Sequence, residues 1–89
     1  HILRFNQGYA DAAYADLAAV MTVPNGKELH DWMTGFVARI GLPDTLSALS
    51  VDEAHLPSIA EKAAKDHLSA TNPRPAEAAD YLRLLQDAM

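Results

Sequence analysis

The sequence predicts an all-α fold, a compact bundle of about four to six helices. Apolar residues recur at spacings of three and four in several separate stretches, which places them along one face of a helix. No stretch alternates apolar and polar residues for long enough to form a sheet strand. Hydrophobic residues make up 49% of the chain but aromatic residues only 7%, so we expect small side chains to dominate the packing between helices.

The first half of the chain contains the strongest helical pattern. The opening residues, HILRFN, are typical of the tail of a helix, and Asp11 is placed to cap a helix that runs to about Met21. Turn residues follow at positions 23–26. The next helix carries a continuous apolar stripe made of Leu29, Trp32, Met33, Phe36, Val37 and Ile40.

Stop and start signals then divide the chain. Gly41 stands where a left-handed helix cap is expected, and Pro43 cannot continue the helix. Residues 45–49 predict a short helical turn. Ser50 and Glu53 have the spacing of a capping box, in which each side chain satisfies the other residue's exposed backbone donor. A new helix is therefore expected directly after them.

Two more helices are predicted in the second half. The first has Pro57 in its opening turn, ends near His67 and has a stripe made of Leu56, Ile59, Ala60, Ala63 and Ala64. The last has Pro75 and Glu77 in its first turn, where a missing N–H and a negative charge are both tolerated. Its stripe is Ala78, Tyr81, Leu82, Leu85 and Met89.

A stiff polar loop separates these two helices. It reads Asn72-Pro73-Arg74-Pro75, and each proline biases the residue before it toward an extended conformation. The loop is therefore expected to act as a strut.

Charge and composition exclude several classes of function. The 12 acidic and 7 basic residues give a net charge of −5 without any run of lysine or arginine, which disfavours nucleic-acid binding. Apolar runs are too short for a membrane span or a signal peptide. The chain has no cysteine, so disulfide and thiolate chemistry are excluded, and this usage is typical of a cytoplasmic protein or a piece of a larger one.

The residue spacings predict no self-contained active site. His30, His55 and His67 include no pair four residues apart and no Glu-x-x-His, so no helical metal site is expected. His30 and His55 are expected to be exposed or associated with helix caps. The serines lack the surroundings of a catalytic nucleophile, and no glycine-rich phosphate loop is present. Solvated helix faces are expected for the carboxylates of Asp16, Asp31, Glu61, Asp80 and Asp87.

Three segments, in order, resemble the C-terminal helical domain of the iron-containing alcohol dehydrogenases, a family that includes maleylacetate and lactaldehyde reductases. They are HILRFN, IGLPDTLSALSVDEAHLPSIAEKAAKD and NPRPAEAADYLRLLQDAM. The resemblance covers nearly the whole chain. It implies that residues 1–89 form a single helical domain, a C-terminal fragment of a two-domain enzyme similar to dehydroquinate synthase.

The resemblance further implies the activity of the parent enzyme, a metal-dependent NAD(P)-linked alcohol dehydrogenase or aldehyde reductase. In the family, an N-terminal nucleotide-binding domain faces the helical domain across the active-site cleft. Fe²⁺, or Zn²⁺ in some members, polarises the alcohol or carbonyl oxygen while the nicotinamide exchanges hydride. The implied partners are that missing domain and a small alcohol or aldehyde; a homodimer is compatible with the resemblance.

The family's metal ligands have no counterpart in this chain. They are one aspartate and three histidines, the last in a Pro-His-Gly motif upstream of the segment that HILRFN matches, and His1 matches a different, non-ligand histidine. The resemblance therefore implies that the 89 residues alone bind neither metal nor nucleotide, contain no catalytic residue and are inactive.

By the same resemblance, His67 and Leu68 form part of the wall of the substrate cavity. The alternative is that His67 only ends its helix and Leu68 fills the core. Asn72, Pro73, Arg74 and Pro75 are expected to form a structural turn that sets where residues 67–71 point. We expect Asn72 and Arg74 to pin this turn by hydrogen bonds.

A function of another class remains open at this point, that of a stand-alone helical protein-interaction module without catalysis. The two functions predict different surfaces. A piece of an enzyme leaves a broad apolar patch where its missing neighbour packs, whereas a binding module presents a bounded groove with a polar rim.

Overall fold

The computed structural model describes residues 1–24 and 27–89, and within them every regular element is helical, which confirms the all-α class. The α-helices are α1 (Ile2–Phe5), α2 (Asp11–Val20), α3 (Leu29–Arg39), α4 (Leu56–Lys65) and α5 (Ala78–Asp87). Three short 3₁₀ helices connect them: η1 (Ser47–Leu49), η2 (Glu53–His55) and η3 (His67–Thr71). Part of the turn predicted at positions 23–26, namely residues 25 and 26, lies outside the described residues.

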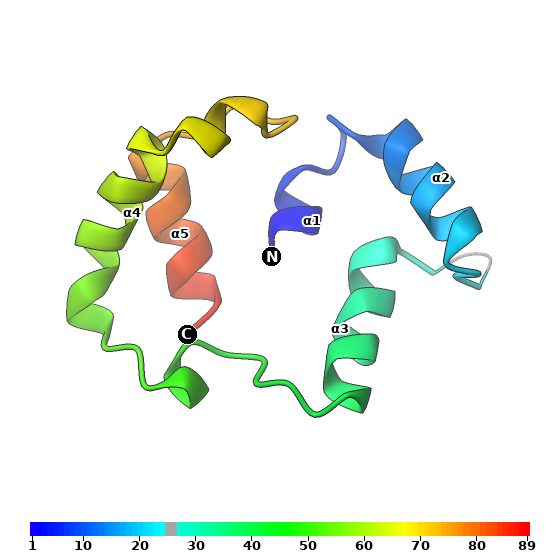
Figure 1. Cartoon of the computed structure of the whole chain (residues 1–89), viewed down its shortest axis with the longest axis horizontal. Helices are drawn as coiled ribbons and strands as arrows, with labels where there is room; N and C mark the ends of the chain where they lie inside the picture. Colours follow the sequence, from blue (N-terminus) through cyan, green and yellow to red (C-terminus); the bar gives the residue numbers. More distant parts are fainter. Residues whose placement is uncertain (25–26) are drawn as a thin grey trace.

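The helices are arranged as an open, flattened ring. Helices α4 and α5 lie side by side on one side of it, α2 and α3 form the other side, and α1 lies between them (Figure 1). The molecule measures 40 × 29 × 17 Å, and its radius of gyration is 14.4 Å. A compact domain of this length would have a radius of gyration of about 12 Å. The packing is therefore more open than the compact bundle that the sequence predicts.

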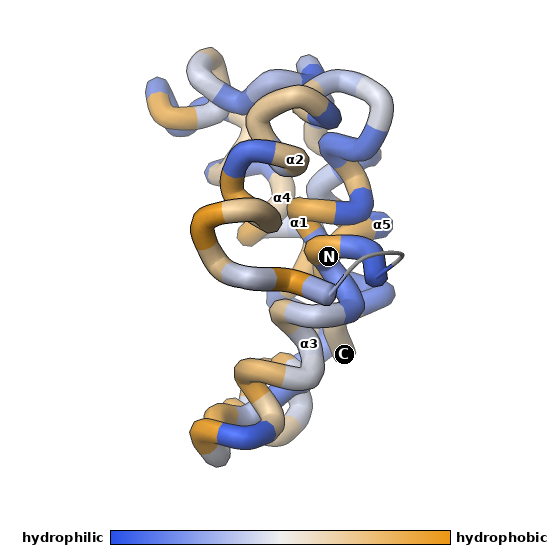
Figure 2. Tube along the Cα trace, turned by 90° about the vertical axis from the view of Figure 1, so that its right-hand side faces the viewer, coloured by the Kyte–Doolittle hydropathy of each residue, from blue (hydrophilic) through white to orange (hydrophobic). Residues whose placement is uncertain are grey.

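Few side chains are fully buried in this ring. The buried apolar residues are Leu29, Leu56 and Ala60, of which the last two lie on α4, the helix that packs against α5. Figure 2 shows hydrophobic segments spread over the whole height of the molecule. Helix α2 contains no buried residue, and Val20 at its end is 83% exposed. None of the helices in the described residues is both long enough and apolar enough to cross a bilayer.

Two of the predicted caps are wrong. Ala10, not Asp11, occupies the cap position of α2, and Asp11 is the first helical residue, where its Oδ1 accepts a hydrogen bond from the backbone N–H of Gly8 at 2.7 Å. Ser50 does not form a capping box, because its φ of 61° places it in the left-handed region at the end of η1. Asp52 caps the next turn instead, accepting a hydrogen bond from the N–H of Ala54.

The start of the last helix also differs from the prediction. Pro75 lies outside α5, which begins at Ala78 with Glu77 in the cap position. The capping box is found here, between Glu77 and Asp80. The predicted end of α3 agrees with the structure, since Gly41 adopts the expected left-handed φ of 74° just after this helix.

Candidate functional site

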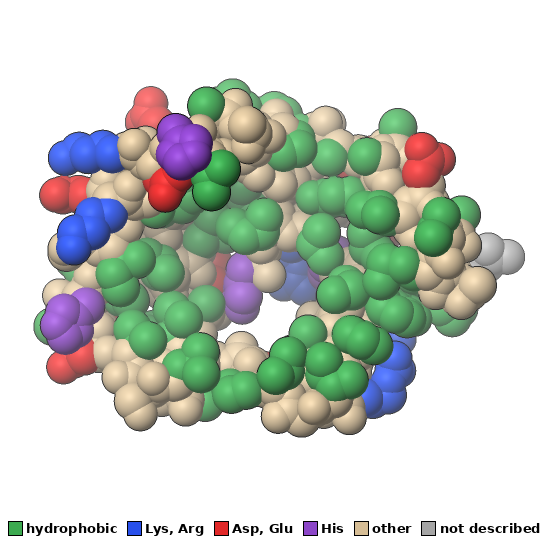
Figure 3. Space-filling model, viewed as in Figure 1, with side chains coloured by type: hydrophobic (Ala, Val, Ile, Leu, Met, Phe, Trp, Pro, Cys, Tyr) green, Lys and Arg blue, Asp and Glu red, His purple; other side chains and the backbone are tan. Residues whose placement is uncertain are grey.

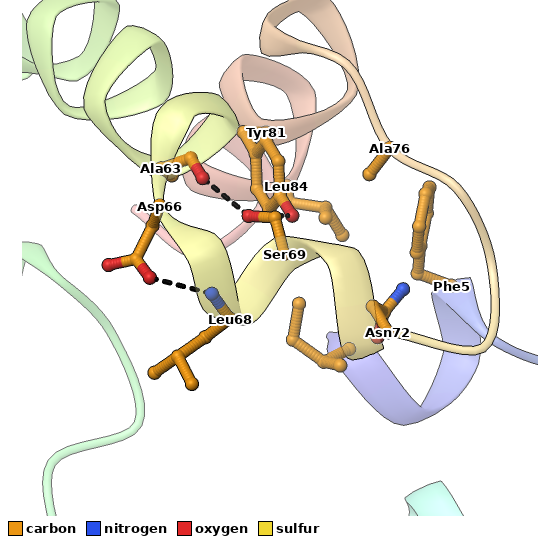
Figure 4. Close-up of a pocket in the computed structure, with 10 residues that line it drawn as sticks. Phe5, Ala63, Asp66, Leu68, Ser69, Asn72, Ala76, Tyr81 and Leu84 are labelled. Carbon is orange, nitrogen blue, oxygen red and sulfur yellow. Dashed lines mark hydrogen bonds between the residues drawn. The ribbon is translucent and has the colours of Figure 1, made fainter.

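A cavity of about 300 Å³ lies where α1, α4, η3 and α5 meet. Its lining is mainly apolar, with a few polar groups (Figure 4). The residues that line it are Ile2, Phe5, Ala63, Asp66, Leu68, Ser69, Asn72, Ala76, Tyr81 and Leu84. Because η3 contributes to this lining and precedes the proline-rich loop, the way in which η3 is held decides the shape of the cavity.

Side-chain hydrogen bonds attach η3 to α4 and α5. The Asp66 carboxylate caps η3 and accepts a hydrogen bond from the N–H of Leu68 at 2.9 Å. The Ser69 hydroxyl donates to the backbone carbonyl of Ala63 in α4. It also accepts a hydrogen bond from the Tyr81 hydroxyl at 2.9 Å, so the polar end of that partly buried side chain has a partner. Figure 4 shows Ser69 between Ala63 and the Tyr81 hydroxyl, with the Asp66 carboxylate pointing away from them toward Leu68.

A pair of amides attaches the other end of η3 to α1. Asn6 Nδ2 donates to Asn72 Oδ1, and Asn72 Nδ2 donates to Asn6 Oδ1, both at 2.8 Å. Asn72 Nδ2 also donates to the backbone carbonyl of Arg74. Asn6 is only 3% exposed, so its amide depends on this pairing for its hydrogen bonds.

Arg74 adds a second connection to α1. Its guanidinium donates to the backbone carbonyl of Phe5, the last residue of α1, at 2.9 Å. It also lies over the ring of Phe5, 4.0 Å from the ring centroid, and 5.6 Å from that of Tyr9. The planar guanidinium can therefore stack and donate at the same time.

The two residues assigned to the cavity wall lie in different surroundings. Leu68 lines the cavity but is 64% exposed, and in Figure 4 its side chain points away from Tyr81, so it does not fill a core. His67 does not end α4, which stops at Lys65; it begins η3. Its side chain is 90% exposed, with Nδ1 lying 3.6 Å from Asp66 Oδ1.

The remaining titratable groups do not assemble into a metal site. His30 Nε2 lies 3.3 Å from Asp31 Oδ1, and Arg4 lies 3.6 Å from the same oxygen. Throughout residues 1–24 and 27–89, no three His, Asp or Glu side chains are close enough to hold a metal ion. The donor groups of the described residues therefore form no site for the metal that the resemblance implies for the parent enzyme.

Sequence reasoning missed the partners that attach η3 to the rest of the fold. Asn6 and Asn72 are 66 positions apart, and no local pattern connects them. Ser69 was considered only as a nucleophile, whereas the structure uses it as a hydrogen-bond bridge to Tyr81. One signal was available: Asn6 directly follows Phe5 at the end of a helical segment that also carries Ile2 and Leu3, which suggests an amide that needs a partner if it is buried.

Known proteins provide two comparisons. The whole chain, residues 1–89, matches the family model described as "Fe-containing alcohol dehydrogenase family, C-terminal". It is 35% identical over 92 aligned residues to a 4-hydroxybutyrate dehydrogenase of Cupriavidus necator, an alignment that covers 99% of this chain and 24% of that protein. The chain thus spans about a quarter of the length of this relative. No solved structure matches the chain.

Proposed function

Because this chain belongs to the Fe-containing alcohol dehydrogenase family and matches its C-terminal part, we propose that it forms one wall of an active-site cleft. The proposed enzyme is a metal-dependent, NAD(P)-linked alcohol dehydrogenase or aldehyde reductase. The match over residues 1–89 carries the proposal. It also bears out the family resemblance read from the sequence. The open cavity beside η3 is the part of this chain best suited to face a small substrate.

The metal and the nucleotide would be held by parts of the enzyme other than these 89 residues. The described residues contain no suitable set of metal ligands, and the dehydrogenase relative is about four times as long as the aligned segment. A bound metal of this family acts as a Lewis acid on the substrate oxygen. The contribution of this chain is to shape the cleft and to exclude water from it.

In this proposal η3 contacts the substrate in two ways, through an apolar contact of Leu68 and a hydrogen bond of His67. The exposed Leu68 side chain offers an apolar surface to the carbon chain of an alcohol or aldehyde. The exposed His67 imidazole offers a hydrogen bond to a polar group at the far end of the substrate. Small primary alcohols are therefore the proposed substrate class, and 4-hydroxybutyrate is the first member to test because the relative carries that name.

The test compares the full-length gene product with the 89-residue chain. Each is assayed for reduction of NAD⁺ or NADP⁺ with 1-butanol and with 4-hydroxybutyrate, before and after metal chelation. We expect turnover by the full-length protein alone, loss of activity on chelation and recovery with Fe²⁺ or Zn²⁺. A full-length protein that oxidises neither alcohol, or whose activity survives removal of all bound metal, would contradict the proposal.

The same assay tests the wall itself through two matched leucines. Leu68 and Leu49 both lie on 3₁₀ helices and are 64% and 59% exposed, but only Leu68 lines the cavity described above. Leu68→Ala is expected to raise KM for 1-butanol about tenfold, because apolar contact with the substrate is lost. Leu49→Ala serves as the control and should leave KM unchanged. Equal effects of the two substitutions on KM would show that Leu68 does not contact the substrate.

A further inference from the structure

We propose that the Asn6–Asn72 amide pair is a positioning device that sets where η3 stands relative to α1, and thereby sets the affinity of the enzyme for its alcohol substrate. This inference rests on the function proposed above, because it assigns substrate contact to η3. Asn6 is a positioning residue, which acts on the substrate only through η3. Asn72 also lines the cavity, so its positioning role is judged from the Asn6 variant, in which the Asn72 side chain is unchanged.

The geometry of the pair explains why it can fix a position. Two amides that donate to each other define both the distance and the relative orientation of the chain segments that carry them. The second N–H of Asn72 is engaged by the carbonyl of Arg74, so the donors of this amide are fully used. An amide in this arrangement has no alternative partner to turn to, and the pair therefore has one preferred arrangement.

The pair acts where α1 ends. Asn6 caps the C-terminus of α1, where the last carbonyl groups of a helix lack partners within the helix. One of these, the carbonyl of Phe5, receives its hydrogen bond from Arg74. The polar loop after η3 thus completes the end of α1, and α1 in turn holds the loop in place.

The opposite side of η3 is attached independently. Ser69 bonds to Ala63 and Tyr81, which belong to the packed pair α4 and α5. Loss of the amide pair would therefore loosen η3 from α1, leaving Arg74 as the remaining link to α1, while the attachment of η3 to α4 and α5 persists. The expected result is a displaced cavity wall in a protein that stays folded, and hence a change in substrate affinity and not in the chemical step.

The experiment uses the full-length enzyme with Asn6→Ala, Asn72→Ala and the double variant. Each single substitution is expected to raise KM for the alcohol about tenfold and to change kcat less than about twofold, since a binding contact common to ground state and transition state is weakened. The double variant should be no worse than the poorer single variant, because both substitutions remove the same pair. Thr34→Val, which removes only a local bond to the His30 carbonyl within α3, is the control with KM unchanged.

Two results would overturn the proposal: multiplicative effects of the two single substitutions on KM, or a fall in kcat equal to the rise in KM. Failure of the proposed function is recognised separately, as absence of activity in the unsubstituted enzyme. In that case, the rate of backbone hydrogen exchange in η3 tests the positioning role of the amide pair. Asn6→Ala should speed exchange at the amide of Asn72, which bonds to Ser69 in η3, and leave the α4 amides unchanged. Unchanged exchange at Asn72 would refute the positioning role.

Discussion

At the scale of single residues, Asp80 shows how one carboxylate closes the last helix. Its Oδ2 accepts a hydrogen bond from the N–H of Glu77 at 3.0 Å, and its Oδ1 accepts one from the guanidinium of Arg83. The backbone hydrogen bond from Glu77, followed by the bond from Arg83, lowers the pKa of the Asp80 carboxyl below its usual value of 3.8. The ionised form is therefore favoured in the folded chain, and Asp80 stabilises α5 only while it is charged.

This cap predicts a pH-dependent difference between the wild-type chain and Asp80→Asn. Because the folded pKa is below the unfolded one, the stabilisation is fully present above about pH 5 and is lost as the pH falls through the folded pKa. We expect Asp80→Asn to lower Tm at neutral pH, and we expect the difference to shrink as the solution is acidified below about pH 4. Thermal unfolding followed by circular dichroism measures both.

The matched control for this substitution is Asp16→Asn, at an exposed position in the middle of α2. It removes the same charge without removing a cap. A difference in Tm between wild type and Asp80→Asn that stays constant down to about pH 3 would show that the Asp80 charge does not stabilise the helix.

At the scale of elements, α3 is the helix with the most complete stop signal. The N–H of Gly41 donates to the carbonyl of Ala38, and the N–H of Leu42 donates to that of Val37. These are the two bonds of a Schellman motif, which requires a left-handed residue after the helix. Gly41 meets this requirement with a φ of 74°, whereas Gly35 lies inside the helix.

These two glycines predict substitutions of opposite sign in the same element. Gly41→Ala should destabilise the chain by about 1 kcal/mol, because a Cβ is strained in the left-handed region. Gly35→Ala should stabilise it by about 0.5–1 kcal/mol, since alanine favours a helix interior and the added Cβ meets no atom within 4 Å. Urea unfolding of the 89-residue chain, at a dilution where it is monomeric, gives both values. Two changes of the same sign would contradict this account of the end of α3.

At the scale of the whole molecule, the open ring leaves more surface exposed than its mass warrants. The accessible surface is 6315 Å² for a chain of 9.6 kDa. A compact monomer of that mass would expose about 5,100 Å². Figure 3 shows hydrophobic side chains around the central opening, and large apolar residues such as Leu17, Ile40 and Leu42 are exposed. The excess surface is consistent with burial against another part of the enzyme proposed above, since the chain spans about a quarter of the length of its dehydrogenase relative.

This surface predicts how the 89-residue chain behaves when it is produced alone. We expect concentration-dependent self-association in sedimentation velocity and binding of the dye ANS, because apolar patches larger than a few hundred Å² tend to be covered. The full-length protein should bind far less dye per molecule. A monomeric 89-residue chain that binds no dye would contradict a missing neighbour and favour the stand-alone interaction module.

The helices were predictable because they depend on nearby residues. The apolar stripe from Leu29 to Ile40 and the stop at Gly41 need only contacts three to six residues apart, and α3 is found where the pattern places it. Cap positions were less predictable. Ser50 and Pro75 were predicted to lie at helix starts, but Asp52 caps η2 and Glu77 caps α5. Neighbouring residues of similar capping ability make such boundaries uncertain by a few positions.

What the sequence determined by itself is therefore the all-α class and the family, since local spacing and an ordered set of motifs carry this information. Only the tertiary structure decided that the loop at 72–75 attaches to α1 through Asn6 and Phe5 and that η3 spans the gap between α1 and the pair α4 and α5. The physical reason is that a hydrogen bond across 66 positions depends on the path of all the residues between its partners, and no local preference encodes that path.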